Sequence, residues 1–424
     1  MVITTRGRVA VALLSIGLIS AACSTNHDKP AASGGPIPVA PTTTDPHLFS
    51  GSDFYATPPA VAGAQHGDLV SYEPIILGAD GLKNAKAWRI LYRSQAANGD
   101  KPIVVSGFVV APDAKSTTPR PVVAWAHATV GSADKCAPSK TFTGVAPANS
   151  GKVGSTLIAQ FQSFVDAGDV VVATDYEGLG TEGPHPYLVG VSEGRGVLDS
   201  IVAAKQFPEL NAGDNSIIYG LSQGGQAALF AGQLAASYTP GVKLAGVVAA
   251  APFSEVDQLL PIAAAIPSVS QYYVLGIYGQ AAGNADLKVK DVLDSSGIAQ
   301  SPTVESQCLD EITKTLQGVL AASGKTTFMA GSPTTFADWK AQLASIVPGK
   351  QATGAPIFIA QGLDDATVPA STTKTLVNRI CGLDRVVYKT YANTGHGDSI
   401  VSADSDIRSF VADRLAGTVF VPAC

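Results

Sequence analysis

The sequence predicts an α/β protein built on a mostly parallel sheet that is covered by helices. Short apolar runs rich in valine and isoleucine alternate with longer segments in which apolar residues recur at helical spacing. Several of the short runs are apolar throughout, as expected of buried strands. The chain has 424 residues and is 46% hydrophobic, which suffices for one large core or two modest ones.

The order of these segments predicts eight strands. The first two, 89–94 and 103–111, are joined by an Ala-Asn-Gly-Asp turn that is typical of a β-hairpin. The other strands are expected at 121–126, 169–174, 216–221, 244–250, 356–361 and 386–391. Helices are expected at 155–167, 195–207, 223–236, 371–378 and 405–415. An antiparallel start followed by a parallel remainder is the outline of the α/β-hydrolase fold.

One connection is much longer than the others. Residues 253–355 separate two predicted core strands, whereas such connections usually have about two to six residues. The segment is rich in alanine, leucine and aromatic residues. Because it lies between core strands, we expect a helical cap inserted over the active site; an independent second domain is the alternative. The core then comprises residues 49–252 and 356–424.

The N-terminal residues 1–22 are typical of an export signal. Arg6 and Arg8 precede an apolar run at 9–22, which is shorter than the about 20 residues that a membrane-spanning helix needs. Small residues then precede Cys23, which favours a lipoprotein whose lipidated Cys23 anchors it to a membrane; ordinary signal-peptidase cleavage is the alternative. The polar, Pro- and Thr-rich segment 23–48 is expected to be a flexible tether. The sequence therefore predicts a secreted protein or a cell-envelope lipoprotein.

Composition and cysteine count narrow the function further. The net charge is −6 and no Lys/Arg cluster is present, which argues against nucleic-acid binding. No CxxC or Cys/His spacing indicates a zinc site, and no metal or organic cofactor is expected. Beyond Cys23, the chain contains Cys136, Cys308, Cys381 and Cys424, an even number in an oxidising compartment. Four cysteines allow three pairings, and four free buried thiols are the alternative.

A G-x-S-x-G motif centred on Ser222 predicts a serine nucleophile. It follows an apolar strand and precedes a helix that starts with small residues. The glycines are required because the serine lies in a strained strand-to-helix turn, which leaves the N–H of Gln223 free to bind an oxyanion. A second G-x-S-x-G motif is centred on Ser192, but it follows a short run after a proline. We interpret Ser192 as a helix N-cap.

A serine hydroxyl is a poor nucleophile at neutral pH unless a base removes its proton. Of the six histidines, His396 follows the last predicted strand on a glycine-flanked loop and completes the Ser, Asp, His order of this fold. Asp365 follows the preceding strand, three residues after Gly362, and would orient the imidazole. Asp364 is the alternative acid, whereas Asp398 is too close to His396 in the sequence to turn back toward it.

The oxyanion needs a second donor beside the Gln223 N–H. In this fold it comes from the turn after the third predicted strand, so we expect the backbone N–H of Ala128 or Thr129 to supply it. The neighbouring His127 is an alternative base, but no acid stands beside it in the sequence.

Taken together, these motifs resemble the secretory lipase family, which includes yeast lipase A-type enzymes and actinobacterial relatives. The resemblance extends over nearly all of Asp53 to Cys424 and is weakest in the predicted cap. Bacterial relatives often have glycine where this chain has Ala128, which adds a methyl group beside the expected oxyanion site. The segments that carry the resemblance are 53–59, 127–129, 136–139, 175–180, 185–187, 192–195 and 220–226.

The resemblance implies the triad chosen above, a cap that contains an acyl-binding tunnel, and a structural role for Ser192. It also implies the disulfides Cys136–Cys308 and Cys381–Cys424, which is the pairing that we favour. The expected activity is hydrolysis of acylglycerol esters through an acyl-enzyme, with a lipid or another ester as substrate. A short-chain esterase, a peptidase or a cell-envelope acyltransferase of the same fold is the alternative, because specificity lies in the cap. A non-catalytic envelope binding protein would be expected to have a broken triad.

Overall fold

A computed structural model describes residues 47–56, 58 and 64–424 of the chain. The predicted export signal (1–22), the lipidation candidate Cys23 and the predicted tether up to residue 46 lie outside the described residues. All the predicted strands and helices lie within them.

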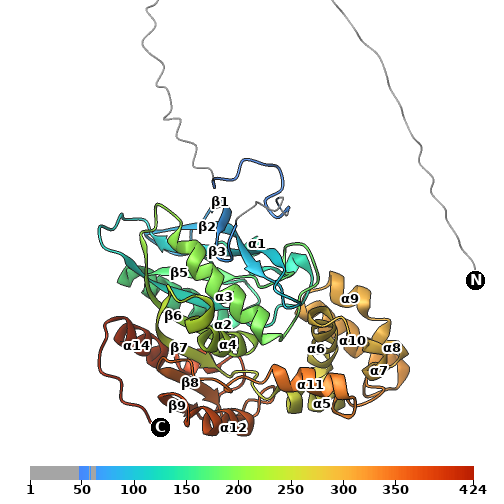
Figure 1. Ribbon diagram of the computed structural model, residues 1–424. Helices are drawn as coiled ribbons and strands as arrows, with labels where there is room; N and C mark the ends of the chain where they lie inside the picture. The colour runs from blue at the N-terminus through green and yellow to red at the C-terminus, as the bar shows by residue number, and fades with distance from the viewer. Residues whose placement is uncertain (1–46, 57, 59–63) are drawn as a thin grey trace, which may run out of the picture. The chain divides into compact units, whose positions relative to one another are not determined.

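The strands form one nine-stranded sheet in the order β1-β2-β3-β5-β4-β6-β7-β8-β9 (Figure 1). The β1-β2, β2-β3 and β3-β5 pairs are antiparallel, and all pairs from β5-β4 to β8-β9 are parallel. This confirms the α/β class with an antiparallel start and a parallel remainder. The strands are β1 (Leu69–Ile75), β2 (Ala85–Gln95), β3 (Pro102–Pro112), β4 (Arg120–Ala126), β5 (Val170–Thr174), β6 (Ala212–Leu221), β7 (Lys243–Ala250), β8 (Ile357–Gly362) and β9 (Val386–Tyr391).

The number of strands corrects the sequence-based prediction of eight. The additional strand is β1, which lies at the edge of the sheet beside β2. Its apolar residues are interrupted by Ser71, Glu73 and Pro74, so it has no continuous apolar run. Proline is tolerated in a strand that lies at a sheet edge, and the strand is revealed by its pairing with β2. Leu48, at the end of the predicted tether, also forms a bridge with Tyr72 of β1, so residues 47 and 48 are not part of a free tether.

Helices cover both faces of the sheet. Among the described residues, no helix is long and apolar enough to cross a membrane. The predicted helices correspond to α2, α3, α4, α12 and α14. The helices outside the segment between β7 and β8 are η1 (Asp134–Cys136), α1 (Pro138–Thr141), α2 (Gly151–Ala167), α3 (Gly190–Lys205), α4 (Gln223–Tyr238), α12 (Ala370–Ile380), α13 (Ser399–Ser402) and α14 (Asp404–Leu415).

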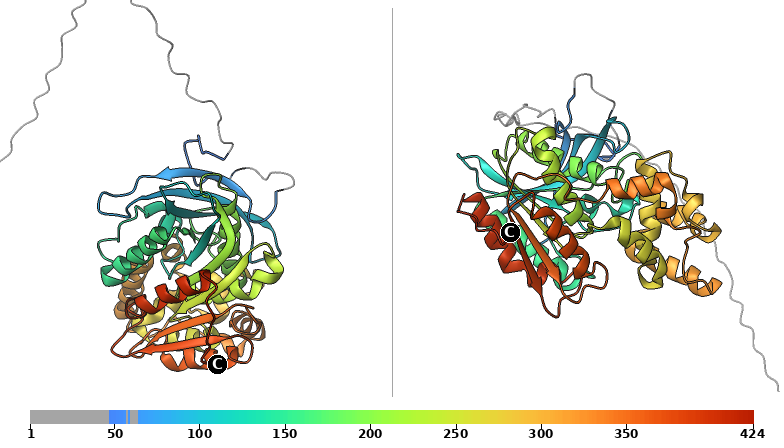
Figure 2. Two further views of the ribbon diagram at one scale, coloured as in Figure 1. Left: turned by 90° about the vertical axis from the view of Figure 1, so that its left-hand side faces the viewer. Right: turned by 60° about the horizontal axis from the view of Figure 1, so that its bottom comes forward.

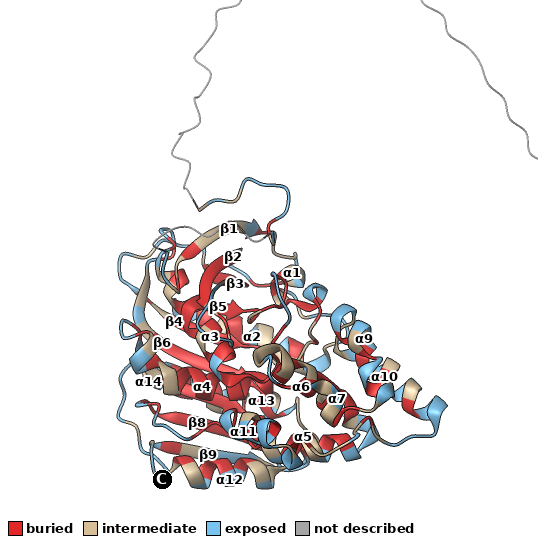
Figure 3. Ribbon diagram, turned by 45° about the vertical axis from the view of Figure 1, so that its right-hand side comes forward, coloured by how far each residue is buried: buried red, intermediate tan, exposed pale blue. Residues whose placement is uncertain are grey.

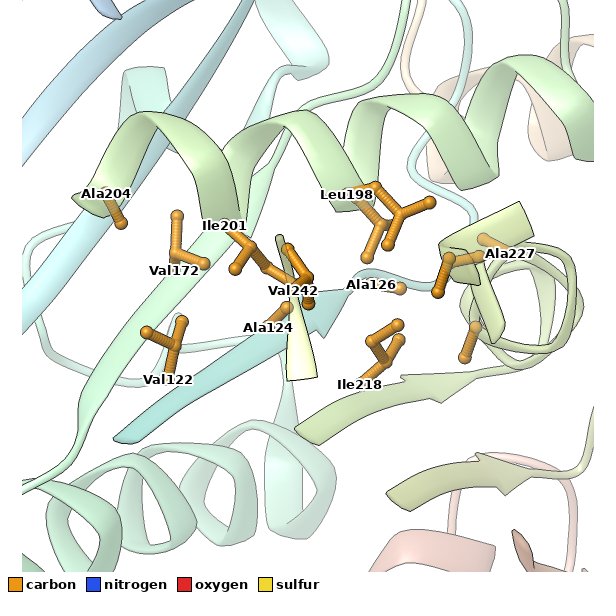
Figure 4. Close-up of a cluster of buried hydrophobic side chains, with 14 of the residues drawn as sticks. Val122, Ala124, Ala126, Val172, Leu198, Ile201, Ala204, Ile218, Ala227 and Val242 are labelled. Carbon is orange, nitrogen blue, oxygen red and sulfur yellow. The ribbon is translucent and has the colours of Figure 1, made fainter. Parts of the chain in front are cut away.

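Alternate residues of each central strand pack on opposite helical layers. In β4, Val122 and Ala124 belong to the apolar cluster that includes α3 and α4, whereas Val123 and Trp125 belong to the cluster that includes α2 and α14. The close-up in Figure 4 shows the first cluster, with side chains of β4 and β6 pointing toward Leu198 and its neighbours on α3. The central strands are therefore buried on both faces, as their red colour in Figure 3 shows.

Residues 253–355, hereafter the helical insertion, join β7 to β8 and have a third apolar cluster of their own. Figures 1 and 2 show these yellow and orange helices gathered beside the sheet. The cluster also includes Tyr187, Leu188 and Val368, so the helical insertion packs on loops of the core. Its helices are α5 (Val256–Ala265), η2 (Pro267–Val269), α6 (Ser270–Gly283), α7 (Val289–Val292), α8 (Ser295–Ile298), α9 (Ser301–Ser306), α10 (Leu309–Ser323), η3 (Pro333–Thr335) and α11 (Ala337–Ser345).

Two disulfides are present, with the predicted pairing. Cys136 and Cys308 have Cα atoms 5.5 Å apart and join η1 of the core to the start of α10 in the helical insertion. Cys381 and Cys424 have Cα atoms 5.4 Å apart and join the end of α12 to the last residue of the chain. The disulfides thus fix the helical insertion and the C-terminal segment to the core.

Replacing both Cys136 and Cys308 by serine is expected to lower the free energy of unfolding by roughly 3–5 kcal/mol. The physical reason is the entropy of the unfolded chain, which loses the constraint on two residues 172 positions apart. The matched control replaces Cys381 and Cys424, which are 43 positions apart, and should have a smaller effect. Denaturant unfolding measures both losses; a larger loss in the control would contradict this expectation.

Candidate active site

The turn between β6 and α4 consists of Ser222 alone, because β6 ends at Leu221 and α4 starts at Gln223. Ser222 has φ +60° and ψ −116°, a backbone conformation that non-glycine residues rarely adopt. Its N–H donates to the Ala250 carbonyl of the neighbouring β7 at 2.9 Å, which holds the strained turn in place. The motif therefore forms the sharp elbow that the sequence predicts.

Both glycines of the motif are required by close backbone contacts. A Cβ at Gly220 would collide with the carbonyl oxygen of Gly224, on the other side of the elbow. A Cβ at Gly224 would collide with the carbonyl oxygen of Ala126, at the end of β4. The first turn of α4 thus approaches the sheet more closely than any side chain would allow.

The structure brings together three residues that are far apart in the sequence. Ser222 Oγ lies 2.8 Å from His396 Nε2, and His396 Nδ1 lies 2.7 Å from Asp365 Oδ2. With the proton on Nδ1 donated to the carboxylate, Nε2 is free to accept the serine O–H. Ser222 and Asp365 are 7% and 6% exposed, so these hydrogen bonds form largely away from bulk water. This is the geometry of a nucleophile, a base and an orienting acid.

Asp365 is held by four donors. Oδ1 accepts the backbone N–H groups of Thr367 at 2.9 Å and Val368 at 2.7 Å, while Oδ2 accepts Gln361 Nε2 at 3.0 Å in addition to His396. The buried Gln361 is the last residue but one of β8 and was not identified from the sequence. A polar residue near the end of an otherwise apolar strand is the signal that could have found it.

The alternative acids lie elsewhere. Asp364 is exposed, although it adjoins Asp365, and its backbone N–H donates to the Thr394 carbonyl. Asp398 is also exposed and precedes the short helix α13. The carboxyl group that contacts the His396 imidazole is therefore that of Asp365.

The residues expected to bind an oxyanion lie in two segments. Gln223 is the first residue of α4, so its backbone N–H has no acceptor within the helix and lies at the positive end of the helix dipole. The turn after β4 contains Ala128, whose carbonyl lies 2.7 Å from His127 Nδ1, and Thr129, whose hydroxyl lies 2.8 Å from the Tyr187 hydroxyl. Tyr187 thus fixes this turn from the side; the sequence placed it in a segment that carries the family resemblance but indicated no role for it.

His127 does not contact Ser222. Its ring nitrogens lie against the backbone carbonyls of Ala128 and Asp175, and its ring packs on Tyr176. Burial lowers the pKa of His127 below its usual value, which favours the neutral imidazole. The partner of the Ser222 hydroxyl is His396.

The prediction that Ser192 is a helix N-cap is wrong. Helix α3 begins two residues earlier, at Gly190, and Val189 occupies the N-cap position. The buried Ser192 hydroxyl instead donates to the Glu177 carboxyl group. The sequence did not predict the true start of this helix, because neither Val189 nor Gly190 is a residue type whose side chain caps a helix N-terminus. The second G-x-S-x-G motif therefore lies within a helix and forms no elbow.

Among the described residues, no group of three or more His, Cys, Asp or Glu side chains is arranged to hold a metal ion.

Comparisons with known proteins agree with this architecture. The family model described as Secretory lipase matches residues 152–422. Lipase A of Moesziomyces aphidis is 26% identical over 196 residues, which cover 46% of this chain and 41% of that protein. The chain therefore matches less than half the length of this relative.

Solved structures are similar over most of the chain. Candida antarctica lipase A in its closed state has a TM-score of 0.75 at 19% identity, covering 88% of this chain and 87% of that one. The rice cell wall degrading esterase LipA from Xanthomonas oryzae has a TM-score of 0.66 at 18% identity, covering 84% and 100%. At these identities the likeness establishes the fold, and it confirms the α/β-hydrolase architecture.

Proposed function

The chain belongs to the secretory lipase family, and we propose that it is a carboxylic ester hydrolase whose nucleophile is Ser222. The observation that carries this proposal is the hydrogen-bonded series from the Ser222 hydroxyl through His396 to Asp365 at a strained elbow. An isolated serine near a histidine would be weaker support. Here the strained backbone and the two obligatory glycines fix the position of Ser222. Four hydrogen-bond donors, His396 among them, fix the carboxylate of Asp365, so the surrounding structure supports all three side chains.

The reaction proceeds in two acyl-transfer steps. His396 Nε2 takes the proton of Ser222 as the oxygen attacks the ester carbonyl, and Asp365 stabilises the imidazolium that forms. The oxyanion accepts hydrogen bonds from the Gln223 N–H and from the turn that contains Ala128 and Thr129. The alcohol leaves with the proton from His396, and a water activated by the same imidazole hydrolyses the acyl-enzyme. No step needs a metal or an organic cofactor.

Within this class we favour a lipase that cleaves acylglycerol esters. The helical insertion packs its apolar cluster against Val368, which also donates its backbone N–H to Asp365. Apolar helices are thus in direct contact with the loop that holds the acid, where an apolar acyl chain would be bound. We also propose that the protein is exported, as a secreted protein or as a cell-envelope lipoprotein anchored through Cys23; this rests on the sequence of residues 1–23.

Ser222→Ala is expected to lower kcat for ester hydrolysis by a factor on the order of 10⁵–10⁶, because the acyl-enzyme can no longer form. An active-site phosphonate should label Ser222 in the unmodified protein, as peptide mass spectrometry would show. Ser192→Ala, which changes the other G-x-S-x-G motif, should keep kcat and labelling. Full activity of the Ser222→Ala variant, or label on Ser192, would refute the proposal.

Asp365→Asn should lower kcat by about 10⁴-fold, because the amide no longer holds the imidazole in the tautomer that accepts the serine proton. Asp364→Asn is the matched control, since it makes the same chemical change one residue away on an exposed side chain. Steady-state kinetics on a soluble ester would compare the two variants. A larger loss in the control would mean that the neighbouring carboxylate is the catalytic one.

The lipase assignment predicts turnover of p-nitrophenyl acyl esters from butyrate to palmitate, and release of fatty acid from an emulsified triacylglycerol, because an apolar acyl site gains free energy with each buried methylene. Turnover of short esters alone would identify a short-chain esterase. Transfer of the acyl group to an added alcohol in preference to water would identify an acyltransferase. If none of the esters is cleaved, the lipase assignment fails.

A further inference from the structure

The carboxyl group of Glu193 makes a buried contact with the elbow that the proposed reaction does not use. Glu193 is the fourth residue of α3 and is fully buried. Its Oε1 accepts Gln223 Nε2 at 2.7 Å and the backbone N–H of Leu188 at 2.9 Å. Its Oε2 is buried and has no hydrogen-bond partner among the described residues. One carboxyl group therefore joins the residue after the nucleophile to the segment that precedes α3.

The Gln223 side chain is fixed by two groups. Besides Glu193, its Nε2 lies 3.2 Å from His185 Nε2. His185 Nδ1 lies 2.8 Å from the Glu177 carbonyl oxygen and therefore carries the ring proton, so that His185 Nε2 is an acceptor. Burial lowers the pKa of His185 to about 4, which keeps the imidazole neutral. Both N–H groups of the Gln223 side-chain amide thus have an acceptor, so this side chain is fixed directly beside the elbow.

Glu193 also holds a strained turn. Leu188 has φ +62°, which is unusual for a branched residue, and its side chain is fully buried in the apolar cluster of the helical insertion. The adjacent Tyr187 carbonyl accepts Gln280 Nε2 from α6 at 2.9 Å. Glu193 therefore supports the elbow on one side and the contact with the helical insertion on the other.

The surroundings of Glu193 favour a neutral acid. The titratable side chains that face it are Tyr176 and Tyr187 and, through Gln223, His185, all of which are buried. Burial raises the pKa of Glu193 to about 8, although the hydrogen bonds from Gln223 and Leu188 act in the opposite direction. At neutral pH the carboxyl group can accept these two hydrogen bonds without carrying a charge.

We infer that Glu193 is a positioning residue: as a neutral acid it fixes Gln223, and hence the oxyanion-binding N–H, without placing a negative charge behind that donor. This inference rests on the proposed ester hydrolysis at Ser222. When Glu193 ionises, its charge repels the oxyanion that develops beside Gln223, and kcat falls.

The test is the pH profile of kcat and KM on a soluble p-nitrophenyl ester, for the unmodified protein and the Glu193→Gln and Glu193→Ala variants. The unmodified protein should lose kcat as the pH rises through about 8. Glu193→Gln keeps an acceptor but cannot ionise, so it should match the unmodified protein at pH 7 and lack this alkaline fall. Glu193→Ala releases Gln223 and should lower kcat by roughly 10–100-fold with little change in KM.

Glu177→Gln is the matched control, because Glu177 is a half-buried residue whose carboxyl pKa burial also raises, but it contacts Ser192 and the Ala97 N–H instead of Gln223. This control should keep the alkaline fall. Circular dichroism across the pH range verifies folding, and Glu193→Gln suffices if Glu193→Ala does not fold. The inference is overturned if Glu193→Gln keeps the alkaline fall, or if Glu177→Gln removes it equally. Activity that persists in Ser222→Ala would instead refute the proposed function itself.

Discussion

The left-handed backbone of Ser222 is the constraint on which the candidate site depends. A serine with φ +60° persists only where its surroundings compensate the strain, and here the compensation comes from the two strands that flank β6. The Ala250 carbonyl of β7 accepts the Ser222 N–H, and the end of β4 lies so close to Gly224 that no side chain fits between them. The elbow therefore depends on having a neighbouring strand on each side of β6, which only a strand inside the sheet has.

The parallel half of the sheet determines what can reach that elbow. Parallel strands place all their carboxyl ends at the same edge, and β6, β7, β8 and β9 are consecutive neighbours. The loop after β8 carries Asp365 and the loop after β9 carries His396, so each supplies one side chain to the series of hydrogen bonds that ends at Ser222. The connection after β7 is the one that expands into the helical insertion.

The helical insertion is joined to the candidate site through few but specific contacts. Gly279 of α6 lies so close to the backbone of Tyr187 that a Cβ would collide with it, and Gln280 bonds to the Tyr187 carbonyl. The Tyr187 hydroxyl in turn lies 2.8 Å from that of Thr129 in the turn after β4. Together with the Cys136–Cys308 disulfide, these contacts connect the helical insertion to the loop that contains Tyr187 and to the turn after β4.

The sequence by itself predicted the fold class, eight of the nine strands, the long insertion and the three residues that meet at the elbow. Each of these is encoded in a short stretch of chain: apolar runs for buried strands, glycines around Ser222, and polar residues directly after the strands that carry Asp365 and His396. Only the tertiary structure revealed the edge strand β1, the start of α3 at Gly190, and the supporting roles of Gln361, Tyr187 and Glu193. These depend on partners between 4 and 58 positions away, such as Gln361 with Asp365 and Thr129 with Tyr187, and a buried polar side chain shows its partner only when the chain is folded.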